Sequence, residues 1–137
     1  MSYQLSAMSS NARRWLWAWV GGAAIGVGNG VLRETTYARF MNPPAAHQVS
    51  TGVAIGAFAA YFAALQRRWP LESAAEANRV GGAWLAATVA FEFGFGRGVA
   101  KLSWEELLAD YNLARGRTWP LVLATIATGP RVAYELD

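Results

Sequence analysis

The chain has 137 residues and a mass of 14.8 kDa, which is room for a single domain. Hydrophobic residues make up 54% of it and charged residues only 15%, against about 25% charged residues in an ordinary soluble domain. The apolar content excludes a disordered chain, and the lack of cysteine excludes a zinc ribbon or a disulfide-stapled secreted domain. Because too few charges remain to coat a soluble globule, we expect an all-α, polytopic membrane protein.

Four stretches with few or no charged residues predict membrane-spanning helices. They cover residues 15–32, 48–65, 80–96 and 118–134, within a single integral membrane domain over residues 1–137. A bilayer core needs about 20 apolar residues per helix, with roughly 17–25 tolerated. The third stretch qualifies despite Glu92. The fourth is the weakest of the four and is compatible with a short, a tilted or a partly re-entrant segment, with Pro120 in its first turn.

Arginine and tryptophan mark the ends of these stretches, as is typical of the membrane interface. Arg13 and Arg14 precede Trp15, and another arginine pair precedes Trp69. Four spans place both termini on the same side of the membrane. Lysine and arginine are equally numerous on the two sides, so their count does not choose an orientation. The arginine pair before the first span favours cytoplasmic termini.

The connection between the third and fourth spans has the pattern of a helix. Ser103 with Glu106 three residues later is a capping box, which satisfies two backbone N–H groups at a helix start. Apolar residues follow at helical spacing: Trp104, Leu107, Leu108 and Tyr111. We therefore expect an amphipathic helix over residues 103–115 that lies in the interface, parallel to the membrane.

Small residues recur every fourth position in the first three spans. The glycines of this pattern are Gly22, Gly26, Gly30, Gly52, Gly56, Gly82 and Gly94. Within lipid the hydrophobic effect does not drive helices together, because lipid chains are as apolar as the side chains. Helix association therefore depends on close packing of the backbones, which small residues permit. The pattern predicts tight helix packing, either inside the chain or against another subunit.

Arg33 and Glu92 are predicted to form a buried ion pair. Arg33 continues the small-residue face of the first span, and Glu92 lies about 18 Å along the third span from its start, in the same leaflet. An unpaired carboxylate at that depth is costly. Arg97 is the second choice of partner for Glu92. It lies five residues further along the same helix and therefore on a different face. Two roles stay open for the pair, a structural contact that fixes helix register and a step in a proton or ion relay.

Other chemistry finds little support in the sequence. His47 is the only histidine, and it is either an interface residue or an axial ligand to a haem or chlorophyll-type metal. There is no nucleophile elbow, and the glycine-rich run at 26–30 lies inside a span with no preceding strand, so it is no phosphate loop. The basic residues form no stripe for nucleic acid. We expect no enzymatic activity, no cofactor and no nucleic-acid partner.

Three motifs lie in the C-terminal half: FEFGFG at 91–96, SWEELLADYN at 103–112 and GRxWxLVL at 116–123. On these motifs, residues 91–130 resemble a family of small bacterial inner-membrane proteins. The resemblance implies a multi-pass protein of the bacterial inner membrane with four helices, and it implies no chemistry. The positions that match the motifs and could form a site are Glu92, Asp110, Tyr111, Asn112 and Arg117.

Two functions are compatible with these features. The first is a non-enzymatic accessory or structural subunit that packs within a larger respiratory or photosynthetic membrane complex, with lipids and other subunits or copies of itself as partners. The second is a small oligomeric channel or transporter with Glu92 and Arg33 in its path. A lipid-modifying enzyme with Asp110 or Glu92 as its base is disfavoured, because acid–base chemistry needs a second positioned group.

Overall fold

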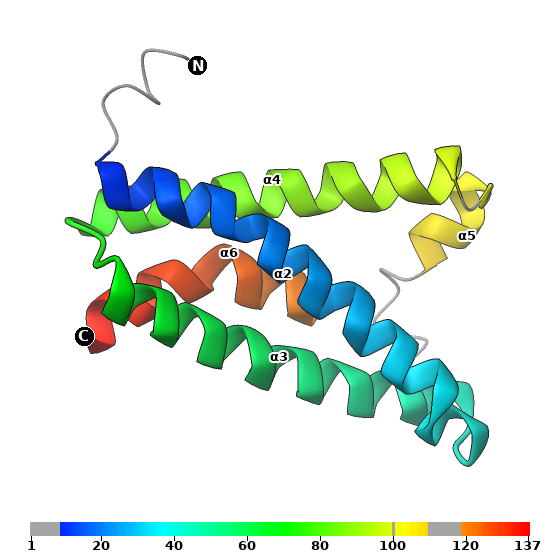
Figure 1. The fold of residues 1–137 in the computed structure, drawn as a ribbon. Coiled ribbons are helices and arrows are strands. Elements are labelled where there is room, and N and C mark those ends of the chain that lie inside the picture. Colours follow the sequence, from blue (N-terminus) through cyan, green and yellow to red (C-terminus); the bar gives the residue numbers. More distant parts are fainter. Residues whose placement is uncertain (1–8, 100, 110–118) are drawn as a thin grey trace.

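The structure is a computed structural model that describes residues 9–99, 101–109 and 119–137, and these residues form helices and no strand. Four long helices alternate in direction (Figure 1): α2 (Ser10–Thr35), α3 (Pro43–Arg68), α4 (Ala74–Gly98) and α6 (Trp119–Leu136). A turn of 3-10 helix, η1 (Tyr37–Arg39), joins α2 to α3, and the short helix α5 (Trp104–Ala109) follows α4. The all-α prediction is confirmed.

The first three long helices begin at capping residues. Ser9, Asn42 and Ser73 each accept, through a side-chain oxygen, the backbone N–H three residues on, at 3.1, 2.9 and 3.0 Å. Such a contact satisfies one of the N–H groups that the first turn of a helix leaves unpaired. In α6, Pro120 occupies the second position, as predicted, where its missing N–H costs no hydrogen bond.

The helices form a four-helix bundle in which neighbours in space are not always neighbours in sequence. Both α2 and α6 pack against α3 and against α4, so α3 and α4 lie on opposite sides of the bundle (Figure 1). The N-terminal end of α2 lies against α4, whereas its C-terminal end runs away from α4 toward the start of α3. This divergence decides where the bundle is densely packed and where it is hollow.

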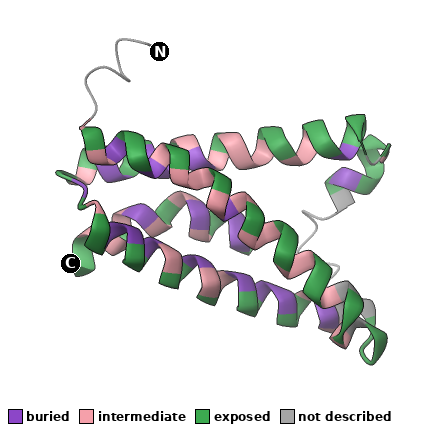
Figure 2. Ribbon diagram, in the orientation of Figure 1, coloured by how far each residue is buried: buried purple, intermediate pink, exposed green. Residues whose placement is uncertain are grey.

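The dense end of the bundle is built on three aromatic rings. Trp15, Phe62 and Trp84 are all nearly fully buried, and they come from α2, α3 and α4 respectively. The Phe62 ring lies 5.8 Å from that of Trp15 and 5.0 Å from that of Trp84, between ring centroids. The indole N–H of Trp84 donates to the Trp15 carbonyl, and that of Trp15 donates to the Trp69 carbonyl, both at 2.9 Å. Figure 2 shows buried residues concentrated at this end and on the inner sides of α3 and α6.

Close helix approaches occur at a set of glycines that differs in part from the one expected. A Cβ atom on Gly22 would lie 2.5 Å from the Trp84 ring, so this glycine does permit packing of α2 on α4. Gly81 lies so close to the Ala127 carbonyl that a methyl group would overlap it, and Gly129 lies equally close to Phe62. These positions join α4 to α6 and α6 to α3.

The other glycines of the predicted pattern make no close approach to any of the residues that the structure describes. A Cβ atom on Gly26, Gly52, Gly56 or Gly82 would meet nothing within 4 Å, and one on Gly30 would meet only Arg33, at 3.9 Å. The four-residue spacing identifies a common helix face, but the rotation of each helix in the bundle decides whether that face points inward. Gly52, Gly56 and Gly82 are exposed, so their faces point outward.

The helix after α4 begins as predicted. Ser103 and Glu106 form the capping box in both directions, with each backbone N–H 3.1 Å from the other's side chain. Leu107 is buried against Gly96. The guanidinium carbon of Arg97 lies over the Trp104 ring, 4.7 Å from the centroid of that ring. The helix is described as far as Ala109, and the predicted continuation over 110–115 lies outside the described residues. Its orientation relative to a membrane stays a prediction.

Two of the described helices are long and apolar enough to cross a membrane, over Ser10–Arg33 in α2 and Ala45–Arg68 in α3. Neither α4 nor α6 meets the same criterion. The first turns of α4 are polar, with Glu76, Asn78 and Arg79, and α6 has only 18 residues with Arg131 and Glu135 near its end. That α4 and α6 also cross a membrane therefore stays a prediction.

The neighbouring glycines Gly81 and Gly82 provide a test of the packing. We expect Gly81→Ala to lower the free energy of unfolding by about 1–3 kcal/mol, because its methyl group overlaps the Ala127 carbonyl. Gly82→Ala is the matched control and should raise it by about 0.5–1 kcal/mol, since the added methyl group meets nothing and alanine favours the helix. Denaturant unfolding in a mild detergent measures both. Equal effects of the two substitutions would contradict the packing of α4 on α6.

Candidate functional site

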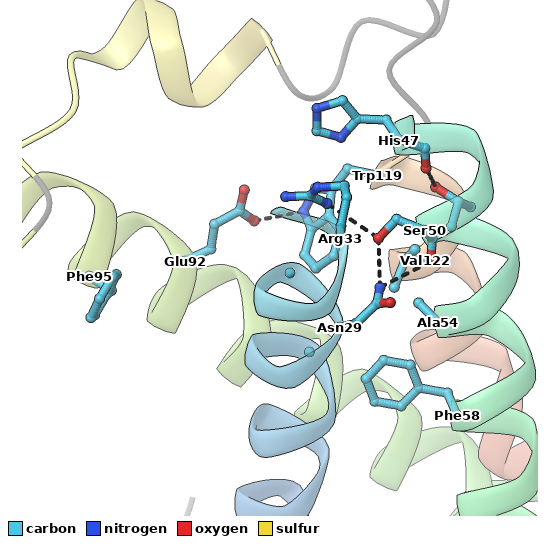
Figure 3. A pocket seen from close by; sticks show the side chains of 13 residues that line it. Asn29, Arg33, His47, Ser50, Ala54, Phe58, Glu92, Phe95, Trp119 and Val122 are labelled. Carbon is cyan, nitrogen blue, oxygen red and sulfur yellow. Dashed lines mark hydrogen bonds between the residues drawn. The ribbon is translucent and has the colours of Figure 1, made fainter. Parts of the chain in front are cut away.

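A cavity of about 390 Å³ lies at the hollow end of the bundle and is lined by all four long helices (Figure 3). At this end α2 diverges from α4 (Figure 1), and the residues of α2 that line the cavity all follow Gly22 in the sequence. Its polar lining residues are Asn29, Arg33, His47, Ser50, Thr51 and Glu92. These six side chains come from α2, α3 and α4 and gather in one cavity, which we take as the candidate site.

Ser50 of α3 accepts hydrogen bonds from two side chains of α2. Asn29 donates from Nδ2 to the Ser50 Oγ at 2.8 Å and to its carbonyl at 3.0 Å, and Arg33 donates from Nη1 to the same Oγ at 3.3 Å. Ser50 is buried, so these bonds replace the water that its hydroxyl loses. Within the described residues, the buried Oδ1 of Asn29 accepts no hydrogen bond. Neither Asn29 nor Ser50 was expected at a site; only their small polar side chains inside apolar stretches could have indicated it.

Glu92 lies on the opposite wall, and its carboxylate points toward Trp119 (Figure 3). The Trp119 indole N–H donates to Glu92 Oε2 at 2.7 Å. This contact joins α4 to the start of α6. From sequence, Trp119 was expected only to anchor a span end. Its side chain instead turns into the bundle and meets Glu92.

The structure brings Arg33 and Glu92 to the same cavity, from α2 and α4. This agrees with the predicted depth and face of both residues. Their described hydrogen bonds go to Ser50 and Trp119, and a direct ion pair between them stays a prediction. Arg97, the second choice of partner, donates to the Leu102 carbonyl at 3.2 Å and stacks on Trp104 at the far end of α4.

The remaining predicted site residues divide into two groups. His47 lines the cavity at the start of α3. The motif residues Asp110, Tyr111, Asn112 and Arg117 lie outside the described residues. In the part of the chain that the structure describes, no three His, Cys, Asp or Glu side chains gather to hold a metal ion.

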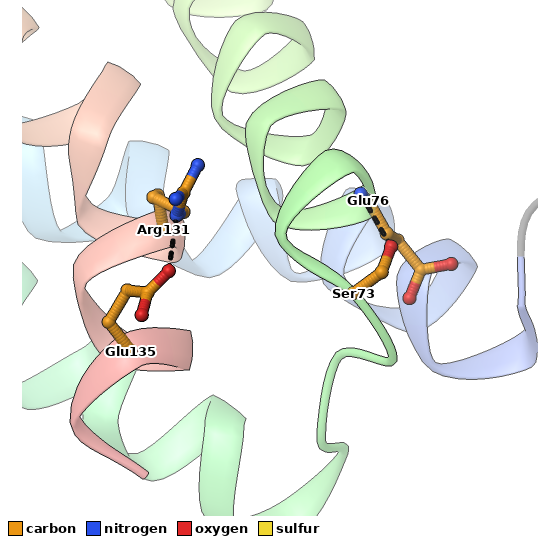
Figure 4. Close-up of polar contacts among 4 residues, drawn as sticks. All are labelled: Ser73, Glu76, Arg131 and Glu135. Carbon is orange, nitrogen blue, oxygen red and sulfur yellow. Dashed lines mark hydrogen bonds and ion pairs between the residues drawn. The ribbon is translucent and has the colours of Figure 1, made fainter.

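A second polar cluster, which the sequence did not indicate, lies at the dense end of the bundle (Figure 4). Glu76 is only 5% exposed, and its Oε1 accepts the Ser9 hydroxyl at 2.9 Å and the Glu72 N–H at 3.0 Å. Its Oε2 accepts the Ser9 N–H at 3.2 Å. These bonds occupy the carboxylate and fasten the start of α2 to the start of α4, so the cluster is structural. Arg131 and Glu135 form an exposed ion pair one helical turn apart on α6, at 2.7 Å.

Comparison of the chain with protein-family models, curated proteins and solved structures finds no match. The resemblance of residues 91–130 to a small bacterial inner-membrane family therefore stays a prediction.

A double-mutant cycle tests whether Arg33 and Glu92 interact. We expect Glu92→Gln to cost more unfolding free energy when Arg33 is kept than in an Arg33→Gln background, with a coupling of about 0.5–3 kcal/mol. The physical reason is that removing one member of a buried pair leaves the other charge uncompensated. Detergent unfolding of the four proteins measures the coupling. Simple additivity would show that each residue is held by its own neighbours and that no ion pair exists.

Proposed function

We propose that the protein spans the membrane four times and is a non-enzymatic accessory subunit of a larger membrane complex in the bacterial inner membrane. The observation that carries this proposal is a pair of outward-facing strips of small residues, on α3 and α4. Three features of the molecule support it: the apolar outer surface, the two strips, and the hydrogen bonds by which the polar groups of the cavity connect the helices.

The outer surface of α2 supports its placement in lipid. The helix carries no charged side chain between Arg14 and Arg33. Of the 18-residue stretch of α2 that is apolar enough to cross a membrane, only 11% is buried inside the bundle. Large hydrophobic side chains are exposed along it, including Trp17 and Val20, which are 80% and 61% exposed. A water-soluble bundle would place charged residues on this side, and an apolar surface of this extent marks contact with a nonpolar partner or solvent.

The surfaces of α4 and α6 support two further spans. Between Val80 and Gly96, the only charged residue of α4 is Glu92, which is turned inward toward Trp119. With its 18 residues, α6 is about 27 Å long, slightly less than a bilayer core of about 30 Å. Its charged residues Arg131 and Glu135 lie near its end and pair with each other.

The strips on α3 and α4 are unlike the surface of α2. The exposed residues of α3 from Gly52 to Ala64 are glycine or alanine, apart from Val53. The exposed residues of α4 that follow the same four-residue spacing are Gly82, Ala86, Ala90 and Gly94. Small residues let a foreign helix approach closely, and such packing is what drives association within lipid. Because α3 and α4 lie on opposite sides of the bundle, the protein could contact two neighbouring helices at once.

The polar groups of the cavity support a structural role over a catalytic one. Asn29 and Arg33 bind Ser50, and Glu92 binds Trp119, so each of these side chains connects two helices. A catalytic acid or base would need to be positioned against a substrate by a second group.

The shared cavity also favours the second candidate function, a small oligomeric channel or transporter. Arg33 and Glu92 line one space, as an ion or proton path requires. Native purification in a mild detergent discriminates the two functions. Larger, different subunits that purify with the chain favour the accessory role, and a ring of identical chains favours the channel or transporter.

A bulky substitution in the α3 strip tests the accessory role. We expect Gly56→Leu to release the chain from its complex, seen as loss of the larger particle in native electrophoresis of membranes solubilised in mild detergent. A Cβ atom at this exposed position meets none of the described residues within 4 Å, so the free energy of unfolding of the isolated chain should stay the same or rise.

Gly28→Leu is the matched control, because Gly28 is an equally open glycine on the bulky, outward side of α2. It should leave the complex intact. If Gly56→Leu also leaves the complex intact, as the control does, the α3 strip faces lipid and the accessory role loses its main support.

A further inference from the structure

A groove of about 460 Å³ lies between the second half of α3 and α6, and it shares no lining residue with the polar cavity. The buried Phe62 lines it, and Gly129 of α6 packs directly on this ring. Ala59 and Ala63 line it from α3 and Val132 from α6, and all three are exposed. This α3–α6 groove has the volume of a site for small ligands.

The uncharged polar side chains of the α3–α6 groove are hydrogen-bonded within the chain. Thr125 and Thr128 donate their hydroxyl protons to carbonyl groups one turn back in α6, at 2.9 and 2.7 Å. The buried Gln66 donates to Asp137 Oδ2 at 3.1 Å and accepts the Leu71 N–H at 3.2 Å. Because these groups have partners, the length of the groove offers mainly hydrocarbon to a ligand, which suits an alkyl chain.

One cation and one anion lie together at the end of the groove. Arg67 is the last residue but one of α3, and Asp137 directly follows α6. The bond from Gln66, the neighbour of Arg67, to Asp137 places the two charges at the same level of the bundle. Both side chains are exposed, and neither forms an ion pair with any residue that the structure describes. The guanidinium and the second carboxylate oxygen are therefore open to a ligand.

In a bundle that spans the membrane, the charged end of the groove lies at the level of the lipid headgroups. Arg67 is one residue from the end of the apolar stretch Ala45–Arg68, and Trp69 comes directly after that stretch. Arginine and tryptophan at a helix end mark the membrane interface. Ala59 lies about 12 Å further along the helix, at about 1.5 Å per residue, toward the middle of the bilayer. The groove thus runs in the direction of an acyl chain.

We propose that the α3–α6 groove binds a zwitterionic phospholipid with a primary amine in its headgroup, and that one acyl chain lies along the groove. The phosphate lies at Arg67, since arginine pairs with phosphate, and the ammonium group donates to Asp137. An anionic lipid would bring no cation to Asp137 and would be repelled by it. The proposal rests on the membrane placement of the bundle. It is independent of the accessory role, because Gly52 and Gly56 do not line the groove.

The binding test uses the full chain in a mild detergent, titrated with three dioleoyl phospholipids and followed by native mass spectrometry. Phosphatidylethanolamine carries both charges, phosphatidylcholine has a methylated ammonium group that donates no hydrogen bond, and phosphatidylglycerol has no cation. We expect the Kd of phosphatidylethanolamine to be about three- to fivefold below that of each other lipid, as for one exposed ion pair. Equal Kd values would overturn the proposal. Tightest binding of phosphatidylglycerol would also overturn it, in favour of a simple anion site.

Two substitutions separate the two charges of the headgroup. Asp137→Asn keeps an oxygen for Gln66 and should abolish the preference for phosphatidylethanolamine over phosphatidylglycerol. A merely structural role of Asp137 would instead weaken all three lipids alike. Arg67→Gln removes the contact with the phosphate that all three lipids share, so it should raise all three Kd values about three- to fivefold and keep their order. An unchanged preference in Asp137→Asn, or unchanged Kd values in Arg67→Gln, would overturn the proposal.

Two neighbouring alanines locate the acyl chain. Ala63 lines the groove, whereas Ala64 is exposed on the same helix and does not line it. Ala63→Leu fills the groove and should raise the Kd of phosphatidylethanolamine about tenfold or more, since displacing two buried methylene groups already has that effect. Ala64→Leu adds the same volume outside the groove and should leave the Kd unchanged. Thermal unfolding without lipid checks that both variants fold. Equal binding by the two variants would overturn the proposal.

The same variants test the other possible occupants of the groove. A dimer in the mass spectra that Ala63→Leu converts to a monomer would assign the groove to a second copy of the chain and overturn the proposal. Gly56→Leu should leave the Kd of phosphatidylethanolamine unchanged whether or not it releases the chain from a larger complex, so failure of the accessory role is distinguished from failure of the lipid site. Carbonate extraction of membranes checks the placement separately. A chain released by carbonate would overturn the placement on which the proposal rests.

Discussion

The hydrogen bond from the Trp84 indole N–H to the Trp15 carbonyl, at 2.9 Å, fixes the contact on which the rest of the bundle depends. It holds α4 against the first turns of α2, and the absence of a side chain on Gly22 lets the Trp84 ring lie flush against that helix. Phe62 of α3 packs on both tryptophans, and Gly129 lets α6 approach Phe62. All four long helices are thus held together at one end, through rings that need small residues opposite them.

Tight packing at that end causes the hollow at the other. Helices that meet at an angle separate with distance from the crossing, so α2 leaves α4 and follows α3. The described hydrogen bonds at the hollow end join α2 to α3 through Ser50 and α4 to α6 through Glu92 and Trp119. The space left between these two pairs is the cavity lined by Arg33, Ser50 and Glu92.

The outer surface of the long helices is largely apolar along their middle parts. The long helices carry exposed valine, tryptophan, glycine and alanine along most of their length, and their charges gather toward the two ends. This outer surface differs from helix to helix: large exposed side chains follow one another along α2, whereas α3 and α4 each carry a strip of glycine and alanine. The proposed contact with other membrane helices would use these strips, because small residues let helices approach closely within lipid.

The sequence by itself determined what depends on short separations along the chain. Helical class, the capping box of Ser103 and Glu106, and the position of Pro120 follow from interactions within about four residues, and the structure contains all three. Only the tertiary structure decided that Gly81 packs inward while Gly56 faces outward, and that Glu92 meets Trp119. Residue spacing defines a helix face but not its rotation, which is set by the packing of all helices together.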